Sequence, residues 1–242
     1  FLKNMNPTKN QIAFSLFHII RPRLANSEVI SLDNIKFDID NVRELLIRNE
    51  QNKNRTVDTN IIQDLGCVEL EAVDRAECCD ISIGCTFLRS KLPLPSAVEL
   101  HHSSLITRVG PIDKMAPPYD RVSYDAVHLA FLNKYTKNKP KWFTKDDSNY
   151  LYVIIDKDAK NKFIASVNVS GVWADPETVA NFKTCDGEPC YTDDSGYPVK
   201  AWMVNYIKTY ILEKYLGKES NAALDESGDY KNNPEIQVSG KR

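Results

Sequence analysis

The spacing of apolar residues changes at Cys67 and changes again near Val199, and this pattern constrains the fold more than any other feature of the sequence. Between these positions apolar and polar residues tend to alternate, which is typical of strands with one buried face. The clearest segments are CVELEAV, ISIGCTFL, LITRVG, NYLYVII and FIASVNVSGVW. They predict a compact antiparallel β-domain over about residues 66–173. The segment YDAVHLAFLNKY at residues 124–135 fits either a strand or a helix.

Two helices are expected before this region. Thr8 is followed three residues later by Gln11, a pair that satisfies the first free amides of a helix, so we expect a helix over residues 8–20. A second helix is expected to open at Asp38 or Asp40 and to end near residue 51. The expected face of this second helix comprises Val42, Leu45, Leu46 and Asn49.

A long helix is expected after the strands, from about Val199 to Leu216, with Gly217 as its stop. Its expected apolar face comprises Met203, Tyr206, Ile207, Tyr210, Ile211 and Leu216. The predicted fold class is therefore α+β, with an antiparallel β-domain in the middle. The expected parts are an N-terminal extended segment and helices in residues 1–65, a central β-rich domain in 66–198, a C-terminal helix in 199–217 and an extended arm in 218–242.

The charge balance argues against a dedicated nucleic-acid-binding protein. The 31 Lys and Arg residues and 33 Asp and Glu residues leave a net charge of -2, whereas a protein that neutralises phosphates carries a basic surplus. No apolar run approaches the roughly 18 to 20 residues that a bilayer-spanning helix needs. We therefore expect a soluble protein that is made in the cytoplasm.

One basic stretch is nevertheless a candidate for contact with nucleic acid. Glu44 and Glu50 interrupt it and no aromatic residues are interleaved with it, so a solvated helix face is the favoured explanation. The basic residues of this stretch are Arg43, Arg48, Lys53 and Arg55.

The six cysteines are too few for a disulfide scaffold in a chain of 242 residues, and we expect mostly free thiols. Two alternatives stay open, a zinc site built from four thiolates and a redox disulfide between Cys185 and Cys190. The cysteines considered for zinc are Cys78, Cys79, Cys85, Cys185 and Cys190.

Signatures of catalysis are missing from the sequence. No G-x-S-x-G elbow frames a nucleophile, and neither a phosphate-binding loop nor a dinucleotide-binding glycine motif occurs. The available histidines are better explained as core or loop residues than as catalytic bases; they are His18, His101, His102 and His128. We predict that the protein is not an enzyme and uses no cofactor.

A series of motifs resembles one family of virion proteins. It begins with Leu65–Cys67, continues through the Cys78–Cys79 pair and Gly84–Cys85, and includes ITRVGPID at Ile106–Asp113. The likeness extends through VSGVWADPETVANF, CDGEPCY and WMVNYIKTYILEKYL, and so covers most of the chain. In these motifs the chain resembles the ring or adaptor proteins, the head-to-tail connectors, of crAss-like and related short-tailed bacteriophages.

The resemblance implies a homo-oligomeric ring of twelve copies that joins the capsid portal to neighbouring tail or ring proteins around a DNA channel. It places the protein in the neck or tail of the virion, assembled in the cytoplasm of the bacterial host and without a membrane partner. The four basic residues above would then face the channel, close to genomic DNA. Adaptor rings of other phages are largely helical, whereas this sequence is β-rich in its middle, so the tier that it occupies in the neck stays open.

A closed ring requires two different faces on each copy. The expected inter-subunit contacts are Phe14, Phe17, Trp202, Tyr206, Tyr210, Ile236 and Val238. The last two belong to EIQV, a short alternating segment of the arm that could add a strand to the sheet edge of a neighbour. The arm is long enough to cross a neighbouring subunit, at about 80 Å when fully extended, or its own domain holds it.

Two other functions were weighed. The rival from another class is a virion-associated small enzyme that depends on cysteine or on a metal ion. A receptor-binding or tail-fibre domain is less favoured, because such chains usually form trimers through repetitive β-structure and no repeat occurs here.

Overall fold

The computed structural model describes two compact units. The helical unit takes its residues from 1–46 and 199–242, and the sheet unit takes its residues from 47–198. Side chains are described for all the residues below except Thr86 and residues 218–222. The described residues are 6–23, 30–53, 57–73, 86–101, 103–132, 135–136, 138–145, 148–156 and 164–222.

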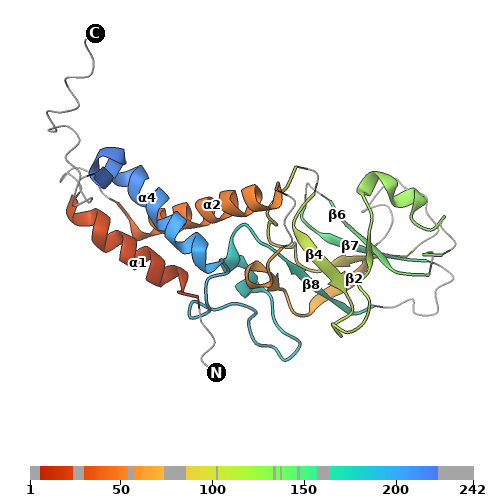
Figure 1. Ribbon diagram of the computed structural model, residues 1–242. Coiled ribbons are helices and arrows are strands. Elements are labelled where there is room, and N and C mark those ends of the chain that lie inside the picture. Colours follow the sequence, from red (N-terminus) through yellow and green to blue (C-terminus); the bar gives the residue numbers. More distant parts are fainter. Residues whose placement is uncertain are drawn as a thin grey trace, which may run out of the picture. The chain divides into compact units, whose positions relative to one another are not determined.

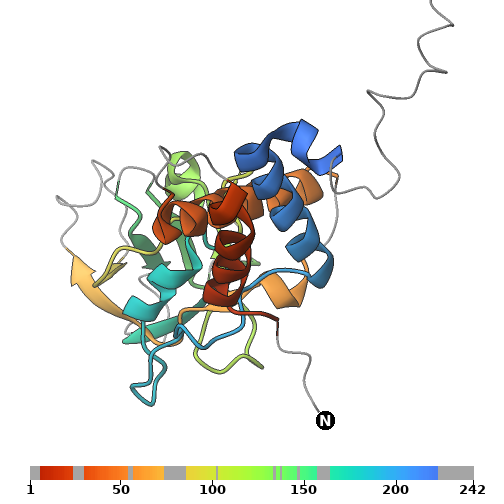
Figure 2. The ribbon, with the colours of Figure 1, turned by 90° about the vertical axis from the view of Figure 1, so that its left-hand side faces the viewer.

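The described part of the helical unit is built from α1 (Lys9–Ile20), the first part of α2 (Leu32–Gln51) and α4 (Ala201–Ala222). The boundary between the two units falls within α2, after Leu46. Helices α1 and α4 lie side by side (Figures 1 and 2). A turn of 3-10 helix, η1 (Arg21–Arg23), follows α1 directly.

Helix α1 begins where the sequence predicts. The Thr8 side chain accepts a hydrogen bond from the backbone N–H of Gln11 at 3.2 Å, and the Gln11 side chain accepts one from the N–H of Thr8 at 3.1 Å. These two reciprocal bonds satisfy amides that the first turn leaves without a partner. The predicted helix and its cap are confirmed.

Helix α2 begins earlier than predicted, because the residue that caps it is Ser31 and not an aspartate. The Ser31 hydroxyl accepts a hydrogen bond from the N–H of Asn34 at 3.1 Å. Asp38 is instead buried, and its carboxylate accepts hydrogen bonds from Lys214 Nζ at 2.7 and 2.8 Å and from the Tyr215 hydroxyl at 2.7 Å. An aspartate that caps a helix in many sequences here connects α2 to α4.

The late predicted start also gave the wrong buried face for α2. The buried stripe runs through Ile35, Ile39 and Val42, which have the spacing of one helix face. Leu45, expected on that face, is 46% exposed. A second ion pair, between Lys9 Nζ and the Asp40 carboxylate at 2.7 Å, links α1 to α2.

Helix α4 packs through Met203, Ile207 and Ile211, none of which has measurable exposure. Its helical conformation is interrupted at Gly217, where φ is 74° and ψ is 160°. This region of backbone conformation is essentially restricted to glycine. The predicted stop at Gly217 is therefore confirmed, and another helical turn follows it.

The sheet unit contains an eight-stranded mixed sheet in the order β1-β8-β2-β3-β7-β6-β5, with β4 also paired to β8 (Figure 1). All described pairs are antiparallel except β5 with β6. The chain thus has the predicted α+β class, with one parallel pair that the sequence pattern did not predict. The strands are β1 (Gln63–Asp64), β2 (Val68–Val73), β3 (Thr86–Ser90), β4 (Ile106–Gly110), β5 (Asp120–Arg121), β6 (Lys141–Thr144), β7 (Leu151–Ile155) and β8 (Ser166–Gly171).

Strand β8 lies in the interior of the sheet, with β4 along one side and β1 and β2 along the other. Its Val167 and Val169 are fully buried, in the same cluster as Trp142 and Trp173. Burial on both faces accounts for an almost continuous apolar run at this position.

Three short 3-10 helices complete the sheet unit: η2 (Thr59–Ile61), η3 (Tyr124–Leu129) and η4 (Pro176–Asn181). The segment that fitted either a strand or a helix is thus partly helical, in η3. The helix predicted at PETVANF is confirmed as η4, where the Asp175 side chain accepts a hydrogen bond from the N–H of Glu177 at 2.9 Å.

Candidate functional site

Three aromatic side chains form an exposed row along α4, which we call the aromatic stripe: Trp202, Tyr206 and Tyr210. Their exposed fractions are 40%, 62% and 50%, and their spacing of four residues places them on one side of the helix. The rings of Trp202 and Tyr206 pack edge to face, with centroids 5.4 Å apart. The prediction that Tyr206 and Tyr210 share the buried face of α4 is wrong, because α4 presents a second apolar surface to solvent.

The aromatic residues of α1 differ from each other. Phe14 is 50% exposed, whereas Phe17 is partly buried and contacts His18 edge to face and the Arg21 guanidinium at 5.5 Å from its ring centroid. Of the two, Phe14 is the more available for an external contact. The sequence analysis missed Phe37 of α2, which is 66% exposed.

The basic candidates also separate. Arg43 is fully buried, so its side chain cannot line a channel and this prediction needs correction. It lies next to Val42 in the buried stripe of α2, and a helix pattern that began at Ile35 would have placed it inward. Arg48 and Lys53 are exposed. Arg55, Ile236 and Val238 lie outside the residues that the structure describes.

A disulfide joins Cys67 to Cys185, with a Cα–Cα distance of 5.1 Å and 118 positions of sequence between them. The expectation of free thiols is wrong for these two cysteines, and the alternative pair Cys185–Cys190 is also wrong. Cys190 has a free thiol that is partly buried, and burial, followed by the nearby Asp64 carboxylate, raises its pKa. A raised thiol pKa disfavours the thiolate that a nucleophile requires.

Gly66 explains why these segments can meet. Its φ is +65°, and a β-carbon there would lie 2.6 Å from the carbonyl oxygen of Lys183 and 2.9 Å from Cys190 Sγ. The next residue, Cys67, donates its N–H to that same Lys183 carbonyl at 3.1 Å. Close backbone approach at a glycine therefore brings Cys67 to the segment that carries Cys185.

Metal and membrane sites were sought in the same residues. No group of three or more His, Cys, Asp and Glu side chains suited to a metal ion occurs within the described ranges. Cys78, Cys79 and Cys85 lie outside those ranges. None of the described helices is long and apolar enough to span a bilayer.

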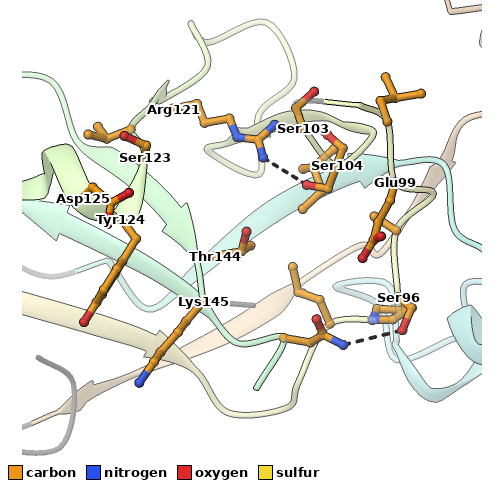
Figure 3. A pocket seen from close by; sticks show the side chains of 17 residues that line it. Ser96, Glu99, Ser103, Ser104, Arg121, Ser123, Tyr124, Asp125, Thr144 and Lys145 are labelled. Carbon is orange, nitrogen blue, oxygen red and sulfur yellow. Dashed lines mark hydrogen bonds between the residues drawn. The ribbon is translucent and has the colours of Figure 1, made fainter. Parts of the chain in front are cut away.

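A polar groove of about 840 Å³ opens on the sheet unit. Figure 3 shows Ser123, Tyr124 and Asp125 on one side of it and Glu99 on the other. Arg121 donates hydrogen bonds to the carbonyl oxygen of Ser104 at 3.1 Å and to its hydroxyl at 3.0 Å. The charged residues that line this groove are balanced: Glu99, Arg121, Asp125 and Lys145.

This geometry provides surfaces for contact and no catalytic arrangement among the described residues. The sequence was then compared with known proteins. A family model described as phage tail ring protein 2 matches residues 11–234, which include most of both units. No curated protein matches the chain significantly. The chain belongs to the phage tail ring protein 2 family of crAss-like phages and is a structural ring protein of the virion.

Proposed function

We propose that copies of this chain close into a ring of twelve in the neck of the virion, where the ring joins the capsid portal to tail proteins and surrounds the DNA channel. The proposal rests on family membership together with the resemblance to head-to-tail connectors. The observation that carries it in the structure is the aromatic stripe. Three large aromatic side chains are held on a helix whose other side is already buried.

The stripe has the properties of an interface centre. Tyr and Trp are enriched at the buried centres of protein interfaces, and a few such residues usually account for most of the binding energy. A closed ring needs a second and different face on the adjacent copy. Phe14 and Phe37 are 50% and 66% exposed and supply candidate apolar contacts for that face.

The channel would be only sparsely basic. Arg48 and Lys53 are the exposed candidates among the described residues, and the net charge of each chain is -2. Few phosphate contacts mean weak, strongly salt-dependent attraction. Such a lining suits the passage of DNA through the ring better than tight binding to it.

Reconstruction of the portal vertex of the virion tests the proposal. We expect a closed ring of twelve chains between portal and tail, with Arg48 and Lys53 on its inner wall. A ring located at a distance from the portal, or an absence of this chain from any ring, would contradict the proposed connector role.

A double variant, Tyr206→Ala with Tyr210→Ala, tests the stripe. Loss of one interface hot spot costs about 2 kcal/mol, so ring assembly should require roughly 30-fold more protein or should fail. Asn205→Ala is the matched control, since Asn205 is exposed on the same helix. Circular dichroism should show that all variants are folded, and equal assembly of the double variant and the control would refute the role of the stripe.

A further inference from the structure

The loop after β4 has an unusual construction that the ring function does not yet explain. This loop, residues 111–118 with the sequence PIDKMAPP, lies within the ITRVGPID motif and just beyond it. Arg108 of β4 extends its guanidinium toward the backbone of the loop. Its Nη2 donates to the Ala116 carbonyl at 2.9 Å, and longer contacts of 3.4 to 3.5 Å reach three other carbonyl oxygens, those of Pro111, Asp113 and Lys114.

Further contacts restrict the same loop. The Asp113 carboxylate accepts a hydrogen bond from the N–H of Met115 at 2.9 Å, and Lys114 Nζ lies 2.5 Å from the Asp64 carboxylate of β1. Two prolines, at 117 and 118, limit the backbone that returns to the sheet. The loop is therefore held in one shape before it meets any partner.

This ordered loop presents an apolar side chain at its tip. Met115 is 93% exposed, the highest value among the exposed large apolar side chains that the structure describes, and Ile112 of the same loop is 44% exposed. An already ordered loop loses little conformational entropy on binding. Methionine is also adaptable at protein contacts and packs favourably against aromatic rings.

The polar groove lies toward the other end of β4. The groove is lined by Ser104 and Ile106, at the start of the strand, whereas the loop follows Gly110 at its end. The returning chain runs back beside β4, with the N–H of Tyr119 bonded to the Val109 carbonyl at 2.8 Å and with Arg121 bonded to Ser104. One unit thus carries a projection and a recess separated by the length of a strand.

The two surfaces match in chemistry. The groove offers the Tyr124 ring together with apolar side chains such as Leu100 and Ile106, and its four charged residues sum to zero. The loop carries one acidic residue, Asp113, and one basic residue, Lys114, and so is also neutral. Neither surface repels the other electrostatically.

We infer that the 111–118 loop of one copy inserts Met115 into the groove of the next copy. The contact is head to tail, and a heterologous contact of this kind generates a ring when its rotation closes. This inference rests on the proposed ring function and assigns a second, independent contact to it, through the sheet unit.

Photo-crosslinking in assembled virions tests the contact. The probe is p-benzoylphenylalanine at position 115, with the same probe at position 132 as the matched control, because Leu132 is a 76% exposed side chain of the same unit. We expect position 115 to form chain–chain adducts that map to residues 94–106 or 121–125, and position 132 to form none with them. Adducts elsewhere, adducts with another virion protein, or no adduct would overturn the inference.

A charge substitution gives a second measurement. Met115→Glu should weaken ring assembly by at least 10-fold, while Leu132→Glu should leave assembly unchanged, and both surface variants should remain folded. Native mass spectrometry or reconstruction reports whether a ring forms at all. If rings form equally well with Met115→Glu, the loop contact is refuted and the ring function stands; if the wild-type chain occupies no ring, the proposed function fails first.

Discussion

Removal of the Cys67–Cys185 disulfide should strongly destabilise the sheet unit. A cross-link lowers the entropy of the unfolded chain, by an amount that grows with the length of the closed loop. For a sequence separation of 118 residues, the chain-entropy relation gives about 4.9 kcal/mol at 25 °C. Measured disulfide contributions are typically about 2 to 4 kcal/mol, so we expect Cys67→Ser with Cys185→Ser to lower the free energy of unfolding by a value in that range or slightly above it.

Tryptophan fluorescence during urea unfolding can report on this unit alone. Trp142 and Trp173 are both buried in the sheet unit, whereas Trp202 belongs to the helical unit. Every variant would therefore carry Trp202→Phe, which removes the helical signal. The Cys190→Ser variant is the control, because its thiol is free and its loss opens no cross-link.

The result is interpretable only if the dependence of the unfolding free energy on urea stays similar between variants. A loss of less than about 1 kcal/mol in the double serine variant would refute the entropic reasoning. Peptide mapping of protein from virions gives an independent check. Recovery of Cys67 and Cys185 as separate thiols would show that the bond does not form in the particle.

Three further outcomes follow from local geometry. Gly66→Ala should cost more than about 3 kcal/mol in unfolding free energy, because a β-carbon there meets the backbone at 2.6 Å, whereas Gly187→Ala, with open space around it, should cost only about 1 kcal/mol of backbone strain. Burial, with the Asp38 hydrogen bond and charge, raises the pKa of Tyr215 to about 12; stability from this group is complete below pH 10 and is lost as pH rises toward 12, and Asp38→Asn should lower that pKa in an ultraviolet titration of the phenol. Thr8→Ala should reduce the free energy of unfolding of the helical unit by about 1 kcal/mol in thermal or urea unfolding, and an unchanged value would argue against the capping box.

Features governed by neighbouring residues were predicted well. The cap of α1 depends on Thr8 and Gln11, three positions apart, and the interruption of α4 depends on one glycine. Strand segments such as Leu151–Ile155 were recognisable from composition alone. In each case the interactions that decide the conformation are made within a few residues of chain.

The candidate contacts were predicted less completely. The exposed aromatic stripe lies on the helix where the sequence placed it, yet the exposed and buried sides of α4 could not be separated from a list of apolar residues. Arg43 was assigned to an exposed face because arginine is usually exposed, and only packing shows that it is buried. The proposed docking loop depends on Arg108, whose role becomes visible only when the carbonyl groups around it are placed.

The sequence by itself determined the α+β class, the local starts and stops of several elements and the resemblance to phage ring proteins, because periodicity, caps and motifs are properties of nearby residues. The tertiary structure alone decided the strand order, the parallel pairing of β5 with β6, the partner of Cys67 and the inward position of Asp38. Each of these features joins segments that are distant along the chain. Their partners depend on the closing of long loops and on side-chain packing, which residue spacing does not encode.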